Sequence, residues 1–128
     1  MASAGITIRA AHFPGRAPIE AYGGGGFRFA GMSHRGSLLC LPSGIHGWEP
    51  PPTLDAASLA RVLDEADRIE VLIVGIGPEI ALLDPALKTT LRAAGIVSEA
   101  MSTGAAVRTY NVLLAENRAV AAALVAVD

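Results

Sequence analysis

The residues best suited to chemistry in this sequence lie in a glycine-containing turn and in a polar stretch further along the chain. The candidate ligand-binding residues are Gly75, Gly77, Glu79, Arg108, Tyr110 and Asn111. Glycines let bare backbone approach another group closely. An arginine can hold a carboxylate or a phosphate through paired hydrogen bonds. These residue types predict a small-anion site where the turn and the polar stretch meet.

The placement of these residues on expected elements supports that hypothesis. The polar stretch falls on an expected helix that begins near Thr103-Gly104, and the free N–H groups of a helix start can receive an anion. Arg108 and Asn111 are three residues apart and share a helix face. If the strands that precede the turn and the helix are neighbours, both features lie at the carboxyl edge of one sheet, where ligands bind in open α/β sheets.

A structural interpretation of the same residues is the one we prefer. In it, Arg108 pairs with a carboxylate such as Glu79 or Glu70. Asn111 then fastens a loop, and Tyr110 packs in the core. The sequence leaves both interpretations open and assigns no catalytic residue.

Other chemically capable residues lack the partners that a site needs. Residues 23–26 are four glycines, but no Lys-Ser or Lys-Thr follows them, unlike in a phosphate loop. His12, His34 and His46 are too irregularly spaced for a metal site. Cys40 lies on an expected strand without a nearby base, which is typical of a small buried thiol. We therefore expect no metal and no cofactor.

Composition restricts the class of protein. The chain has 128 residues, of which 52% are apolar, so we expect a single domain over 1–128, with an N-terminal arm at 1–17. Its net charge of −2 argues against nucleic acid as a partner. No apolar run reaches the roughly 18 residues of a membrane span. A single cysteine fits a reducing compartment. We expect a cytoplasmic protein, or a mitochondrial one if the chain is eukaryotic, because Arg9 and Arg16 weakly resemble a transit peptide.

The elements that position the candidate site are organised around residues 69–77, Ile-Glu-Val-Leu-Ile-Val-Gly-Ile-Gly. A nearly unbroken apolar run of strand length predicts a strand buried on both faces. We expect 69–74 to be an interior strand, flanked by strands near 96–98 and 119–127.

Three expected helices alternate with these strands. Asp55 is suited to cap the first, and Asp84-Pro85 supplies the N-cap and first position of the second. Ser102 or Thr103 caps the third, which runs to about Glu116. The alternation of helix and strand predicts right-handed crossovers and a largely parallel sheet.

The first third of the chain has a different pattern. Short strand-like segments at 19–22, 27–29 and 36–41 are separated by tight glycine turns, which predicts a small antiparallel unit. Residues 42–53 carry four prolines and Trp48. We expect this segment to be an ordered strap, with Trp48 substantially buried against the sheet.

Several segments resemble a known family. They are Tyr-Gly-Gly-Gly-Gly-Phe-Arg at 22–28, Gly-Ser-Leu-Leu-Cys-Leu-Pro at 36–42, Gly-Ile-Gly at 75–77, and Arg-Thr-Tyr-Asn within 101–116. Together they are similar to the uncharacterised-domain family that includes the mitochondrial assembly factor of respiratory complex I and the adipogenesis-associated domain protein. The resemblance covers residues 18–127. Val107, Ser102 and Ile76 stand where many members have Cys, Asp and Thr, so a cysteine-dependent reaction at that helix is not expected.

The resemblance implies a fold and a class of function. The implied fold is α/β and three-layered, with a central mixed, mostly parallel five-stranded sheet, helices and an antiparallel β unit. The implied function is a non-catalytic binding or assembly-type module with a protein partner. The alternative is a small ligand-binding protein or enzyme with an anion pocket between the turn at 75–79 and the helix carrying Arg108. The oligomeric state is open.

Overall fold

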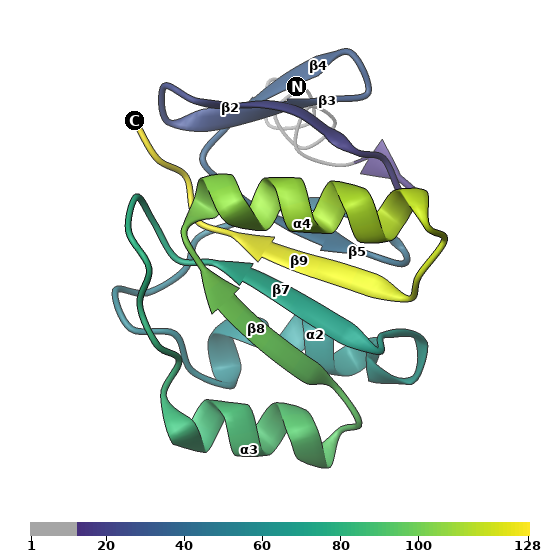
Figure 1. Cartoon of the computed structure of the whole chain (residues 1–128), viewed down its shortest axis with the longest axis vertical. Helices are drawn as coiled ribbons and strands as arrows, with labels where there is room; N and C mark the ends of the chain where they lie inside the picture. The colour runs from purple at the N-terminus through teal and green to yellow at the C-terminus, as the bar shows by residue number, and fades with distance from the viewer. Residues whose placement is uncertain (1–12) are drawn as a thin grey trace, which may run out of the picture.

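The computed structural model describes residues 13–128, which form two sheets and three layers (Figure 1). The central sheet has the strand order β1-β6-β5-β9-β7-β8, and a smaller sheet has the order β2-β3-β4. The expected N-terminal arm falls largely outside the described residues. The strands are β1 (Phe13–Pro14), β2 (Ile19–Gly23), β3 (Gly26–Phe29), β4 (Met32–Arg35), β5 (Ser37–Leu41), β6 (Gly44–Trp48), β7 (Val71–Gly75), β8 (Val97–Met101) and β9 (Val120–Leu124).

The parallel part of the central sheet confirms the expectation for the apolar run. Strand β7 lies between β8 and β9 and runs parallel to both. Four of its five residues are buried, because layers of side chains cover both faces of the strand. The glycine turn that follows β7 therefore opens at the carboxyl edge of three parallel strands.

The rest of the central sheet differs from the expectation in strand number and direction. Within residues 13–128 it has six strands rather than five, of which β9, β7 and β8 are parallel to one another. Strand β5 leaves the expected antiparallel unit and pairs antiparallel with both β6 and β9. Strand β6 occupies part of the expected proline strap, because the tight turn at Pro42-Ser43 returns the chain alongside β5. The unit at the start of the chain is instead completed by β4.

Helical segments follow the expected order. They are η1 (Ala57–Leu59), α2 (Ala60–Asp64), η2 (Ala66–Arg68), α3 (Pro85–Ala93) and α4 (Thr103–Ala115). Side-chain caps mark the starts of α3 and α4. The first segment begins after Ala56 without a side-chain cap, and the predicted cap Asp55, just before it, accepts from the Ser58 N–H at 2.8 Å. The Asp84 carboxylate accepts a hydrogen bond from the Ala86 N–H at 3.0 Å at the start of α3. Ser102 caps the start of α4. After its last residue and the C-cap Glu116, Asn117 adopts the left-handed conformation, with φ at 59°, and stops the helix.

The two faces of the central sheet are covered by different partners. One face packs against α4 and the small sheet, around core residues that include Phe29, Ile73 and Tyr110. The other face packs against α2 and α3. Trp48 is mostly buried, as expected: it lies at the end of β6, packs against this second core and donates its indole N–H to the Ser58 carbonyl at 2.8 Å. Among the described residues no helix has the length and apolar character to cross a bilayer.

Candidate functional site

A hollow of about 480 Å³ lies where the carboxyl end of β7 meets the start of α4. The turn after β7, the first turns of α4, the segment after β9 and one tyrosine of β2 enclose it. The lining residues are Tyr22, Gly77, Pro78, Ser102, Gly104, Ala105, Arg108, Ala126, Val127 and Asp128. The hollow thus lies between the glycine turn and the polar stretch that the sequence analysis singled out, and it has the size of a small-ligand site.

Thr103 holds the walls of the hollow together. It is fully buried, and its hydroxyl accepts a hydrogen bond from the Gly77 N–H at 3.1 Å and donates to the Val125 carbonyl at 2.7 Å. Its own N–H donates to the Gly77 carbonyl at 2.8 Å. The Val125 N–H donates to the Gly75 carbonyl at 2.8 Å. One side chain therefore links the glycine turn, the start of α4 and the segment that follows β9.

Two glycines lie in close contact with their neighbours at this point. A Cβ on Gly75 would lie 2.9 Å from both the Ala106 Cβ and the Thr103 Cα. A Cβ on Gly104 would lie 2.3 Å from the Tyr22 hydroxyl oxygen. Gly75 thus lets α4 approach the sheet, and Gly104 admits the tyrosine hydroxyl of β2 to the edge of the hollow.

Arg108 lines the hollow and is exposed. Within residues 13–128 the ion pairs are Arg68–Glu65 and Arg118–Glu70, so the expected pairing of Arg108 with Glu79 or Glu70 is not formed there. The first turn of α4 supplies a second donor beside it. The Ala105 N–H donates to the Ser102 hydroxyl at 3.3 Å, whereas the Gly104 N–H forms no hydrogen bond within the described part of the chain.

Tyr110 is placed in the core and does not line the hollow. Its side chain is 1% exposed and packs beside Cys40. Burial raises the pKa of the Cys40 thiol to about 12, and the neighbouring Tyr110 hydroxyl offsets only part of that rise. Burial also raises the pKa of Tyr110. Both groups stay protonated near neutral pH, so neither is set up as a nucleophile or a base.

Asn111 and Glu79 also lie away from the hollow. The Asn111 side chain accepts from the Ile19 N–H at 2.9 Å and donates to the Ile19 carbonyl at 2.8 Å. It therefore fastens strand β2 to α4, where the structural interpretation expected it to fasten a loop. Glu79 is exposed in the segment between β7 and α3. Of the six candidates, Gly77 and Arg108 line the hollow, and Gly75 shapes its wall.

Sequence reasoning missed several residues of the hollow. Tyr22 and Asp128 come from opposite ends of the chain, and no local pattern links them to Arg108. The one available signal was Thr103, a polar residue at the start of a helix that follows a strand. Its sequence position predicts a helix cap and a helix start that can receive an anion, and its burial beside two glycines adds the role of joining three segments.

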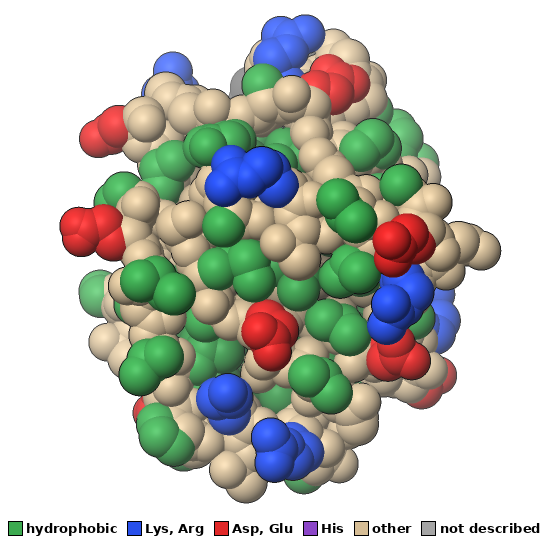
Figure 2. Space-filling view, viewed as in Figure 1, with side chains coloured by type: hydrophobic (Ala, Val, Ile, Leu, Met, Phe, Trp, Pro, Cys, Tyr) green, Lys and Arg blue, Asp and Glu red, His purple; other side chains and the backbone are tan. Residues whose placement is uncertain are grey.

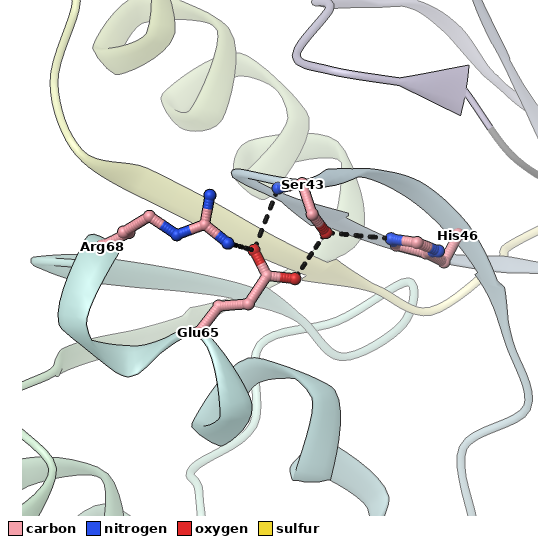
Figure 3. A network of polar contacts seen from close by, with 4 residues as sticks. All are labelled: Ser43, His46, Glu65 and Arg68. Atoms are coloured by element: carbon pink, nitrogen blue, oxygen red, sulfur yellow. Dashed lines mark hydrogen bonds and ion pairs between the residues drawn. The ribbon is translucent and has the colours of Figure 1, made fainter.

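A second polar cluster joins the turn between β5 and β6 to the helical segment beside it (Figure 3). The Glu65 carboxylate accepts from the Ser43 N–H at 2.9 Å, from the Ser43 hydroxyl at 2.5 Å and from Arg68 at 3.0 Å. The His46 Nε2 lies 3.3 Å from the Ser43 hydroxyl oxygen, and its Nδ1 lies 3.1 Å from an Arg61 nitrogen.

The geometry of this cluster differs from that of a catalytic triad. In a triad the carboxylate orients the histidine, and the histidine accepts the serine proton. Here the serine proton goes directly to Glu65, and the histidine nitrogen remote from the serine faces a guanidinium instead of a carboxylate. The contacts fasten the turn to α2 and η2. Within residues 13–128 no group of three or more acidic, histidine or cysteine side chains is placed to hold a metal ion.

Known proteins resemble the chain over most of its length. A protein of Rhodobacter capsulatus is 44% identical over 112 residues, which cover 88% of this chain and 86% of that protein. The Xenopus tropicalis NADH dehydrogenase (ubiquinone) 1 alpha subcomplex assembly factor 3 is 34% identical over 111 residues, which cover 84% of this chain and 60% of that protein. The chain thus matches about three fifths of the length of the frog relative.

Solved structures and a family model agree with these relatives. A crystal structure of a Bartonella henselae protein, described as an outer membrane protein, is 59% identical with a TM-score of 0.87, and the match covers 91% of this chain and 99% of that one. The family described as "Protein of unknown function (DUF498/DUF598)" matches residues 19–125. This chain is therefore a member of the DUF498/DUF598 family, the same family as the complex I assembly factors that its glycine and Arg-Thr-Tyr-Asn segments resemble.

Proposed function

We propose that this chain is an assembly-type binding module, which holds a protein subunit before that subunit joins a larger complex. The observation that carries the proposal is the similarity to assembly factor 3 across 84% of the chain. Because the name of that relative contains NADH dehydrogenase, this complex is the first one to test.

A deletion in the native host tests the proposal. Loss of an assembly module should lower the amount of assembled NADH dehydrogenase complex on native gels, while its subunits accumulate in smaller assemblies. Cross-linking of the tagged chain should capture one of those subunits, and a plasmid copy of the chain should restore the complex. An unchanged amount of complex in the deletion strain would contradict the proposed function.

A second candidate function is the binding of a small anion in the hollow. One observation favours it: Arg108 and Gly104 both line the hollow, and neither the Arg108 guanidinium nor the Gly104 N–H forms an ion pair or hydrogen bond within the described residues. A cation and a free helix-start amide are the donors that phosphate or carboxylate groups prefer. Asp128 lines the same hollow and opposes an anion there.

Thermal unfolding with and without millimolar phosphate or sulfate tests this second function. A ligand that binds only the native state raises its stability, so the wild-type midpoint should rise with anion concentration. Arg108→Ala should leave stability without anion within about 0.5 kcal/mol, because the side chain is exposed and forms no ion pair in the described chain, and it should abolish the anion response. Lys88→Ala, an exposed cation on α3 outside this hollow, is the matched control. An equal response in wild type and Arg108→Ala would exclude the hollow as the anion site.

A further inference from the structure

Strand β8 is an open edge of the central sheet. It pairs with β7 on one side, and among the described residues no strand pairs with its other side. Sheet edges are usually protected by prolines, bulges or several charges, because an open edge can pair with another chain. Strand β8 is a regular five-residue strand without proline, its register with β7 is continuous, and Glu99 is its one charged residue.

The hydrogen bonds of β8 show which backbone groups are free. The Val97 N–H donates to the Glu70 carbonyl at 3.0 Å, and the Met101 carbonyl accepts from the Ile76 N–H at 2.9 Å. Because a parallel ladder uses every second residue of a strand, Val97, Glu99 and Met101 direct their backbone groups toward β7. Ser98 and Ala100 direct theirs outward, where they form no hydrogen bond in the described chain; Ser98 is 7% exposed and Ala100 is half-buried.

Apolar side chains flank both faces of this edge. On the α4 face, Val97 is 58% exposed and Val112 of α4 is 56% exposed. Figure 2 shows this face, on which hydrophobic side chains gather between scattered charged ones. On the α3 face, a hollow of about 390 Å³ is lined by Leu82, Leu83, Pro85 and Ala100 together with the charged residues Lys88 and Glu99, and Leu82 is 92% exposed. An edge with free backbone groups and apolar flanks has the features of a surface that receives an added strand.

We propose that β8 binds an extended segment of a partner protein, which adds a seventh strand to the sheet. The segment carries a lysine or arginine opposite Glu99 and apolar residues beside Val97 and Leu82. This inference rests on the proposed assembly function and names the surface and the chemistry of the partner. The outward groups of Ser98 and Ala100 supply the main-chain hydrogen bonds, and the flanking side chains select the partner's sequence.

Charge distinguishes a separate partner from a second copy of the chain. If two copies paired antiparallel through β8 with full overlap, Ser98 would oppose Ala100 and Glu99 would oppose Glu99 of the other copy. The two carboxylates would then be direct cross-strand neighbours on one face, an arrangement that destabilises a pair of strands. Any shift of register that separates them leaves fewer residues paired. A cationic residue opposite Glu99 reverses the sign of this interaction.

Amide hydrogen exchange with a synthetic peptide tests the proposal. The probe is a capped heptapeptide of alternating threonine and valine with lysine at its centre, and its control has glutamate at that position. In the free protein, the Ser98 and Ala100 amides should exchange much faster than those of Glu99 and Met101. The lysine peptide should slow exchange at Ser98 and Ala100 and leave the hollow at Gly104 unaffected. It should bind about fivefold more tightly than the glutamate peptide.

Two variants and one control measurement complete the test. Glu99→Lys should reverse the preference between the two peptides without a change in fold, because Glu99 is exposed. Ala100→Pro should abolish peptide binding, and the fold should survive because an edge strand tolerates proline where its N–H faces outward. Sedimentation should show a monomer. Protection of Ser98 and Ala100 that rises with protein concentration alone would assign the edge to a second copy and overturn the proposal.

The outcomes separate this inference from the function on which it rests. If neither peptide protects Ser98 and Ala100, and Ala100→Pro still restores the NADH dehydrogenase complex in the deletion strain, the edge proposal is wrong and the assembly function stands. If the deletion has no effect on the complex but the lysine peptide binds at β8 with the predicted charge preference, the edge proposal stands and the assembly function is wrong.

Discussion

Replacement of Thr103 by valine isolates the hydroxyl that joins the three walls of the hollow. Valine has nearly the same shape as threonine and keeps the methyl contacts of a fully buried position. It removes the acceptor of the buried Gly77 N–H, at 3.1 Å, and the donor to the Val125 carbonyl, at 2.7 Å. The substitution therefore changes hydrogen bonding without leaving a cavity.

The cost follows from what becomes of the two former partners. The Gly77 N–H is left buried without an acceptor, which costs about 1–3 kcal/mol. The Val125 carbonyl lies in a half-buried residue, and loss of its hydrogen bond costs about 1 kcal/mol. The expected loss in the free energy of unfolding is about 2–4 kcal/mol. At about 4 °C per kcal/mol for a domain of this size, Tm should fall by roughly 8–16 °C.

Urea unfolding, thermal unfolding and amide exchange at Gly77 measure this effect. Thr103→Ser keeps both hydrogen bonds and loses one methyl group, so it should cost only about 1 kcal/mol. Thr90→Val removes a helix-surface hydroxyl that donates to the Ala86 carbonyl at 3.1 Å, and should cost less than about 0.5 kcal/mol. If Thr103→Val proves as stable as Thr103→Ser, the hydroxyl does not hold the turn, and the account of the hollow given above is wrong.

Three further predictions concern other parts of the fold. Asn111→Ala should cost about 1–3 kcal/mol and speed amide exchange at Ile19, whereas Asn111→Asp should lose only the donated bond. Because the unfolded Cys40 thiol ionises near 9.0 and the folded one near 12, stability should fall as pH rises from 9 toward 12. In urea titrations, the free energy of unfolding should fall between pH 7.5 and pH 10.5, and this fall should be about 2 kcal/mol smaller in Cys40→Ala than in the wild type. Trp48→Ala should cost about 2 kcal/mol in urea titrations, with part restored in Trp48→Phe, since the indole is mostly buried and bonds Ser58; a cost below about 0.5 kcal/mol would show that it is dispensable.

The parallel half of the fold was predictable because its signals are local. A continuous apolar run marked β7, and Asp84-Pro85 and Ser102 marked the helix starts that the structure has. The interior position of β7 between the two other parallel strands followed from its continuous apolar character. Each of these signals lies within a few residues of the feature that it predicts.

The antiparallel half was harder to predict because strand pairing there is decided by distant segments. The local sequence pattern of β5 is similar to that of the other short strands in the first third of the chain. In the structure, however, β5 pairs with β9, more than 80 residues later. Strand β6 contains two glycines and follows Pro42, a composition that favours a connection over a strand. Its pairing with β5 overrides that weak local preference. The number of strands therefore depended on contacts that no local pattern encodes.

The geometry of α4 explains which candidate residues could share a site. A helix turns by about 100° per residue, so Arg108 and Tyr110, two positions apart, are separated by about 200° and lie on nearly opposite sides. Thr103, Ala106 and Tyr110 form the buried stripe, and that stripe requires Arg108 to face outward. A pocket that uses both Arg108 and Tyr110 side chains could therefore have been excluded from the helical period alone. The period leaves open whether an outward arginine meets a carboxylate, because that depends on where the turn after β7 and the residues near Asp128 lie in space.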